Sequence, residues 1–151
     1  MKKLLALTVM VIMTFGMIAC DKDTANVQPS VTQIEDKGVI SGTEYSISQT
    51  ELQKYQLGIL EEQDYYCDAY EEDDSPLFCF IGSINGKETN YRIAVSDIEA
   101  DNAGKVTITV FADKSQKGQG REDGYGTVVE MYPMPKAVKV VDTEGNELTG
   151  K

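Results

Sequence analysis

The chain has 151 residues, enough for one compact core, and 41% of them are hydrophobic, which argues against disorder along its whole length. It carries 25 acidic and 14 basic residues, a formal net charge of −11, so the phosphate backbone of a nucleic acid would repel it. It contains no histidine, which is the commonest general base and the commonest metal ligand. We therefore expect a non-enzymatic protein that has no cofactor, no metal and no nucleic-acid partner.

The chain begins with a cationic start, Met1–Lys3, followed by an uncharged apolar stretch from Leu4 to Met17. This stretch is shorter than the roughly 20 residues of a membrane-spanning helix. A cationic flank, an apolar core and a small residue before a cleavage point are typical of a secretory leader. The sequence thus predicts a signal peptide over residues 1–19.

Ala19 and Cys20, at the end of this leader, resemble the lipobox of bacterial lipoproteins. The resemblance implies cleavage before Cys20 and acylation of its thiol with palmitate-like chains. Each buried methylene contributes about 0.8 kcal/mol, so two or three such chains would hold the protein on a lipid membrane. We expect a lipid-anchored protein on the extracytoplasmic face of the cell membrane. The alternative is an ordinary secretory signal that leaves Cys20 unmodified.

Residues 20–37 are polar and contain Pro29, which predicts a flexible tether, so we expect the folded domain over residues 38–151. Alternating apolar residues predict a strand within 39–48. Ser48 and Glu51 have the spacing of a capping box, which predicts a short helix over about 49–60.

Cys67 and Cys79 form an even pair once Cys20 is acylated. In an oxidising compartment such a pair predicts a disulfide. Closing a loop of this length contributes about 3 kcal/mol in the chain-entropy description. The alternative is two buried free thiols. Two cysteines without histidine do not make a zinc ligand set.

The segment between these cysteines is acidic over residues 68–74 and carries tyrosines. Its carboxylates could hold calcium, but their spacing does not match an EF-hand loop, so a solvated loop tip is the favoured interpretation. Tyr66 and Tyr70, on a disulfide-pinned loop, suit partner recognition; the alternative is that they fill the core. We expect Phe78 and Phe80 to fill the core.

The second half of the chain predicts further strands. Residues 77–84 end at a hairpin-type turn, Asn85-Gly86, and the runs 91–96 and 105–110 alternate between polar and apolar residues. Residues 112–126, rich in glycine and charge, are predicted as a long mobile loop, and 127–132 and 136–141 as two last strands. The fold class is therefore mainly β, as a single small antiparallel β-sandwich or curled sheet with one short helix.

Residues 86–141 resemble the C-terminal domain of PrcB, a protease-complex subunit found in bacterial surface lipoproteins. The matching pieces are a corner over Gly86–Tyr91, a hairpin over 91–111, and a Tyr132-Pro133 step before the last strand. The resemblance implies a non-enzymatic, envelope-anchored accessory domain that assists or binds a protease. It carries no catalytic residues.

Together these observations predict a lipid-anchored binding or accessory module with an envelope or extracellular protein partner. The candidate contact residues are Tyr66, Tyr70, Thr89, Tyr91, Gly118 and Arg121. One alternative is a protease inhibitor that presents 87–91 and 112–126 as wedge loops, which requires Thr89 and Gly118 at the same end of the molecule. Another is a calcium-dependent adhesion module that uses the acidic segment.

Overall fold

The computed structural model describes residues 30–69 and 74–151, and its compact unit runs from Val31 to Lys151. The predicted signal peptide, Cys20 and Tyr70 lie outside the described residues. The strands are β1 (Lys37–Ile40), β2 (Thr43–Glu51), β3 (Tyr65–Ala69), β4 (Leu77–Ile81), β5 (Tyr91–Ala100), β6 (Lys105–Lys117), β7 (Tyr125–Tyr132) and β8 (Ala137–Asp142). An α-helix, α1 (Lys54–Glu62), and a short 3-10 helix, η1 (Arg121–Asp123), complete the described elements.

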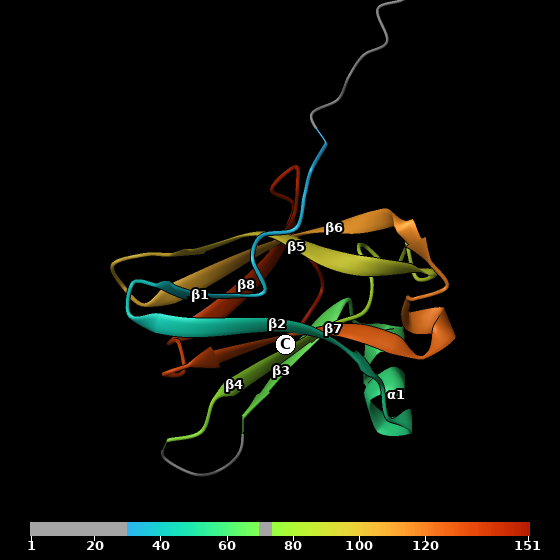
Figure 1. The fold of residues 1–151 in the computed structure, drawn as a ribbon. Coiled ribbons are helices and arrows are strands. Elements are labelled where there is room, and N and C mark those ends of the chain that lie inside the picture. Colours follow the sequence, from blue (N-terminus) through green and yellow to red (C-terminus); the bar gives the residue numbers. More distant parts are fainter. Residues whose placement is uncertain (1–29, 70–73) are drawn as a thin grey trace, which may run out of the picture. The chain divides into compact units, whose positions relative to one another are not determined.

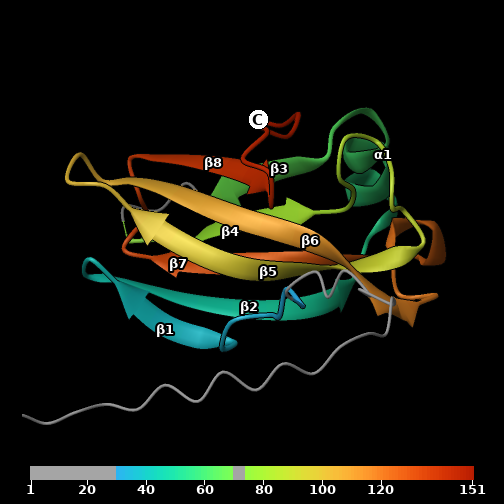
Figure 2. The same ribbon diagram turned by 90° about the horizontal axis from the view of Figure 1, so that it is seen from above.

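The strands form two sheets that pack face to face (Figures 1 and 2). The larger sheet has five strands in the order β1-β2-β7-β4-β3, and the smaller has three in the order β5-β6-β8. The predicted fold class, mainly β with one helix, is confirmed. None of the helices in the described part of the chain is long and apolar enough to cross a membrane.

Alternation along the strands builds the core between the sheets. On β6, Val106, Ile108 and Val110 are buried while Thr107 and Thr109 between them are half-buried. This is the period of two expected of a strand with one dry face. The buried residues that meet between the sheets include Ile47, Cys79, Ile81, Val129 and Met131 from the larger sheet and Ile93, Val95, Ile98, Val106, Ile108, Val110 and Val140 from the smaller.

The predicted helix begins later than its capping pattern suggested. Ser48 lies inside β2, which continues to Glu51 because it pairs with β7 from Glu44 to Glu51, Ser48 opposite Val128. The helix starts at Lys54, after Gln53 donates its backbone N–H to the Gln56 side chain at 2.7 Å. A reciprocal contact of the capping type is therefore made at Gln53, further along the chain than the predicted Ser48.

The prediction of a long mobile loop over 112–126 is wrong. β6 continues to Lys117 because a register shift lets Tyr91 of β5 pair with Lys117. Only the stretch between Lys117 and Tyr125 connects β6 to β7, and it contains η1. The charged residues at this end of β6 are consistent with a strand whose side chains face water.

One strand pair departs from the antiparallel expectation, since β6 and β8 are parallel. The chain leaves β7 in the larger sheet, passes the cis Tyr132–Pro133 bond and enters the smaller sheet as β8. Because β7 and β8 belong to different sheets, they do not form a hairpin, and β8 runs beside β6 instead.

Chain segments cover two exposed strand edges. The chain end runs beside β3, where Asp64 donates its backbone N–H to Thr149 O at 2.7 Å and Cys67 donates to Lys151 O at 2.8 Å. Before β1, Ile34 donates to Val95 O at 3.0 Å, so part of the range predicted as tether contacts β5. Covering an edge strand in this way removes a template for unwanted strand pairing.

Candidate functional site

The hairpin of β3 and β4 is crosslinked at its centre. Cys67 and Cys79 are directly paired across the two strands, with Cα atoms 4.0 Å apart, and form a disulfide. Cys79 is fully buried and belongs to the core between the sheets. The predicted disulfide is therefore confirmed, and it fixes the register of β3 against β4.

The neighbours of the two cysteines point away from the core, because successive side chains of a strand alternate between faces. Tyr66 pairs with Phe80 on one side of the disulfide, and Asp68 pairs with Phe78 on the other. The interpretation that Phe78 and Phe80 fill the core between the sheets is wrong. Both lie on the outer face of the larger sheet and are half-buried.

Two rows of paired residues cross this outer face. The row nearer to α1 is mostly apolar, whereas the next row places an aromatic ring between two carboxylates. In order from β3 through β4 and β7 to β2, the rows are Tyr66, Phe80, Val128 and Ser48, and then Asp68, Phe78, Glu130 and Ser46. Neighbours in such rows have Cβ atoms about 5 Å apart, so each row forms a continuous strip.

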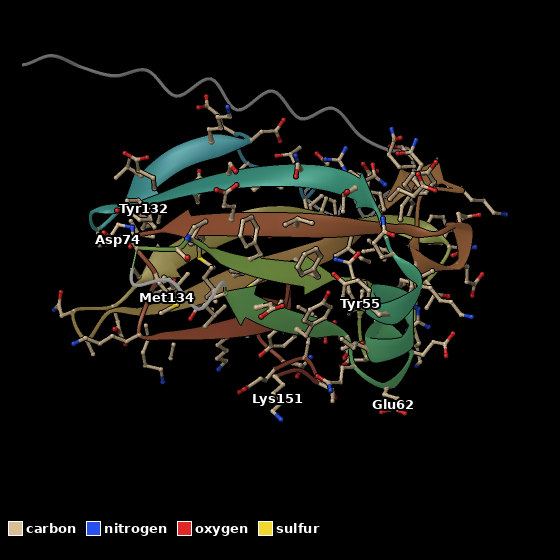
Figure 3. The ribbon with its side chains drawn as sticks, turned by 90° about the horizontal axis from the view of Figure 1, so that it is seen from below. Tyr55, Glu62, Asp74, Tyr132, Met134 and Lys151 are labelled. Atoms are coloured by element: carbon tan, nitrogen blue, oxygen red, sulfur yellow. A yellow bond between two sulfur atoms is a disulfide. The ribbon has the colours of Figure 1, made fainter. Side chains whose placement is uncertain are left out.

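The strips and α1 enclose a cleft of about 330 Å³, which we call the aromatic cleft. Its aromatic lining is Tyr55, Tyr66, Phe78 and Phe80, and its polar lining includes Ser48, Thr50, Gln56 and Asp68. Figure 3 views this face of the molecule and shows Tyr55 where α1 meets the sheet. Tyr55 is 66% exposed, although it is a large aromatic residue.

Stacking and packing contacts hold the aromatic residues in the wall of the cleft next to α1. Tyr66 and Phe80 stack with ring centroids 4.9 Å apart and an interplanar angle of 12°. They pack with Leu52 and Leu60 in a second small apolar cluster beneath the helix. Burial raises the pKa of Tyr66 to about 12, although a hydrogen bond with Gln56 acts in the opposite direction. Tyr66 is only 7% exposed, so its ring is part of the packed wall of the cleft and its hydroxyl is already paired with Gln56.

A second hollow of about 480 Å³ adjoins the aromatic cleft on the same face. Ser46 and Glu130 line it, two residues along β2 and β7 from Ser48 and Val128 of the cleft. Tyr132, which is 44% exposed, lies at its far end, and Figure 3 shows it at the opposite end of the sheet from Tyr55.

The outer face of the smaller sheet is different in character. There the paired residues are polar: Glu99 lies opposite Thr107, Thr107 opposite Lys139, and Asp97 opposite Thr109. A polar outer face of this kind is typical of a sheet that packs on the core with one face and contacts water with the other. These paired residues of the smaller sheet therefore form no counterpart to the aromatic cleft.

Thr89, Tyr91, Gly118 and Arg121 come together at one end of the sandwich. Gly118 donates its backbone N–H to Asn90 O at 2.9 Å. The Thr89 carbonyl accepts a further backbone hydrogen bond from the η1 segment. The two turns therefore form one connected surface, which we call the loop end.

Gly120 and Arg121 hold the loop end in place. A Cβ on Gly120 would lie 2.2 Å from Thr89 O and 2.6 Å from Tyr91 N, so only glycine fits there. Arg121 donates a hydrogen bond to Leu60 O in α1. The loop end is thereby attached to the helix that also borders the aromatic cleft.

The predicted contact residues thus divide into two places. Tyr66 lies in the aromatic cleft, and Thr89, Tyr91, Gly118 and Arg121 lie at the loop end. Sequence reasoning missed Tyr55 and Glu130 as members of the cleft face. Tyr55 lies in the range predicted as a helix and Glu130 in a range predicted as a strand, and neither position signals that the sheet order brings it near Tyr66.

Within residues 30–69 and 74–151, no three His, Cys, Asp or Glu residues are grouped closely enough to hold a metal ion. Comparison with known proteins gives no match to a protein family, a curated protein or a solved structure. The functional argument therefore depends on the residues and geometry of this chain.

Proposed function

We propose that this protein is a lipid-anchored, extracytoplasmic binding module that holds a protein partner on the outer face of its larger sheet. The observation that carries the proposal is the aromatic cleft, in which the exposed Tyr55 borders the half-buried Phe78 and Phe80. Exposed apolar surface rimmed by polar groups is typical of interaction sites. Tyrosine is enriched among residues that contribute most to binding.

The crosslinked hairpin supports this proposal. The Cys67–Cys79 disulfide lies directly behind the two pairs of cleft residues, so it restricts their motion before a partner arrives. Pre-organised contact residues lose less conformational entropy on binding. Disulfides persist in oxidising compartments, which agrees with the export predicted from residues 1–19.

The lipid anchor is proposed from the lipobox-like Ala19-Cys20 pair. Its test is metabolic labelling with palmitate in bacteria that produce the full chain or its Cys20→Ala variant. We expect label and membrane association for the unaltered chain and neither for the variant. Membrane association without label, or label that persists in the variant, would rule out acylation at Cys20.

The binding face is tested by site-specific photocrosslinking on intact cells. A photoreactive residue at Tyr55 should give a discrete crosslinked product, whereas the same residue at Glu99, on the polar face of the smaller sheet, should not. Equal products from both positions, or a product from Glu99 alone, would contradict the proposed face.

The resemblance of residues 86–141 to PrcB favours a protease, or a protein bound to one, as the partner. The proposal is that the module assists such an enzyme without catalysis of its own. If this is correct, the product crosslinked from Tyr55 will include a protease or a subunit of a protease complex.

A second candidate function, protease inhibition, is favoured by one specific observation. Thr89 and Gly118 lie at the same end, joined by backbone hydrogen bonds between their turns, as a wedge of two loops requires. An inhibition assay against serine, cysteine and metalloproteases tests it directly. Inhibition that is lost when Thr89 is changed would support this candidate, and no inhibition at about micromolar protein would reject it.

A further inference from the structure

We propose that the aromatic cleft and the adjoining Glu130 receive a cationic side chain, arginine or lysine, that a protein partner presents. This inference depends on the proposed function, because it names the chemistry of the partner of the same face. The aliphatic stem of that side chain would lie along the apolar strip, and its charged head would lie beside the two carboxylates.

The position of the charged head follows from the strand register. Asp68, Phe78 and Glu130 are consecutive across β3, β4 and β7, so a carboxylate stands on each side of the aromatic residue. Asp68 is exposed and Glu130 half-buried. Cations are attracted both by carboxylates and by the faces of aromatic rings, and arginine uses both contacts together.

The position of the stem follows from the neighbouring strip. Tyr66, Phe80 and Val128 are consecutive across the same three strands, two residues along each strand toward α1. Tyr66 and Val128 are 7% and 8% exposed, so the half-buried Phe80 offers the stem most of its apolar surface. The methylene stems of lysine and arginine pack against such apolar surface while their heads stay at its polar border. The cleft of about 330 Å³ has room for one long side chain.

The charge of the face favours a cation over other ligands. The paired residues that cross this face include three carboxylates, Glu44, Asp68 and Glu130. They include one amine, that of Lys37 on the edge strand β1. No ion pair to these three carboxylates occurs within residues 30–69 and 74–151. The whole chain carries a net charge of −11, so a cationic partner would also be attracted from a distance.

The test compares two peptides that differ in charge but hardly in shape. The probes are acetyl-Leu-Arg-Leu-amide and its citrulline analogue, in which a neutral urea replaces the guanidinium group. Each is titrated to about 5 mM into the isotope-labelled full chain in detergent micelles, and backbone amide shifts are followed. We expect the arginine peptide to shift amides of the cleft strands and the citrulline peptide to bind at least about tenfold more weakly, a difference of about 1.4 kcal/mol.

Matched variants locate the charge recognition. Asp68→Asn and Glu130→Gln each remove one charge without changing side-chain size, and each should weaken the arginine peptide about threefold or more. Glu99→Gln, on the smaller sheet, removes an equal charge from the polar face and should leave the affinity unchanged. Raising the salt concentration should weaken binding to the unaltered chain.

Three results would overturn the inference. They are equal binding of the two peptides, an equal effect of all three variants, and no shift of cleft amides by the arginine peptide. The same titration with maltotriose, a neutral sugar, provides a further contrast, and preferential binding of the sugar in the cleft would also contradict it. If the Tyr55 crosslink on cells persists in any of these cases, the proposed binding face stands and only its charge preference fails.

Discussion

Tyr66 and Phe80 stack with ring centroids 4.9 Å apart on the outer face of the β3–β4 hairpin, immediately beside the disulfide on its inner face. The same two strands thus provide a covalent link to the core and the stacked rings that pack beneath α1 at the wall of the cleft. Apart from this link, the outer strand of the hairpin is held by hydrogen bonds to the chain end and by the packing of Tyr66 beneath α1. The candidate site is therefore coupled to the stability of the hairpin.

Removing the disulfide should destabilise the fold. For the Cys67→Ala, Cys79→Ala double variant we expect the free energy of unfolding to fall by about 3 kcal/mol, because the unfolded chain regains the freedom of a closed loop. Urea unfolding measures the change. A reductant should lower the stability of the unaltered chain to a similar value and leave the variant unaffected. A loss below about 1 kcal/mol would contradict this account of the crosslink.

Alkaline pH should destabilise the protein through Tyr66. Burial raises its folded-state pKa to about 12 from the ordinary 10.0, so the unfolded chain loses the proton first and ionisation favours unfolding. The stabilising contribution is fully present below about pH 10 and is lost as the pH rises toward 12. Burial also raises the pKa of Tyr65, so both residues act in the same direction.

Urea unfolding at a series of alkaline pH values, with tyrosinate absorbance followed in parallel, tests this effect. In Tyr66→Phe the slope of stability against pH should be smaller but not zero, because Tyr65 remains. A slope identical to that of the unaltered chain would show that Tyr66 has no raised pKa.

Asp64 should be one of the most sensitive polar positions. It is 2% exposed, and its carboxylate accepts hydrogen bonds from Ser83 Oγ at 2.6 Å, Gly86 N at 2.7 Å and Thr149 N at 3.0 Å. Asp64→Ala would leave these donors without partners, at a cost of about 3 kcal/mol or more. Asp142→Ala is the matched control, because that exposed carboxylate also accepts backbone hydrogen bonds but water can replace it. Thermal unfolding that ranks the control as the more harmful change would contradict the assigned role.

Two glycine-to-alanine changes should have opposite effects. Gly120→Ala would force a Cβ to within 2.2 Å of Thr89 O, and the resulting overpacking should cost about 1–3 kcal/mol and disturb the loop end. Gly58→Ala, in α1, places a Cβ in open space and should stabilise the helix by about 0.5–1 kcal/mol. Thermal unfolding of the two variants tests both signs. If Gly120→Ala is neutral, the close contact is not a constraint on the fold.

The clearest sequence patterns predicted the fold class and the hairpin of β5 and β6. The alternation of Val106, Ile108 and Val110 with threonines survives in the structure because β6 has one buried face, whereas on β5 Ala94 is buried as well as Ile93 and Val95. β3 could not be predicted in the same way. Its sequence, from Tyr65 to Ala69, runs into an acidic segment, and its strand conformation depends on pairing with a distant partner, β4.

The candidate site was predictable only in part, for a related physical reason. The even pair of cysteines predicted the disulfide. The tyrosines near Cys67 made Tyr66 a candidate contact residue. The assembly of the cleft depends on β7 lying between β2 and β4, a long-range arrangement that local periodicity does not contain. Phe80 and Val128 are separated widely along the chain and become neighbours only through that sheet order.

The most direct test of the proposed binding face is tyrosine nitration, compared between intact cells and the purified full chain. Tyr55 is 66% exposed beside the aromatic cleft, and Tyr125 is 39% exposed at the loop end, so both should react in the purified protein. If a partner occupies the cleft, Tyr55 will be protected on cells while Tyr125 reacts as before. Equal reactivity of Tyr55 in both settings, or protection of Tyr125 alone, would contradict the proposal.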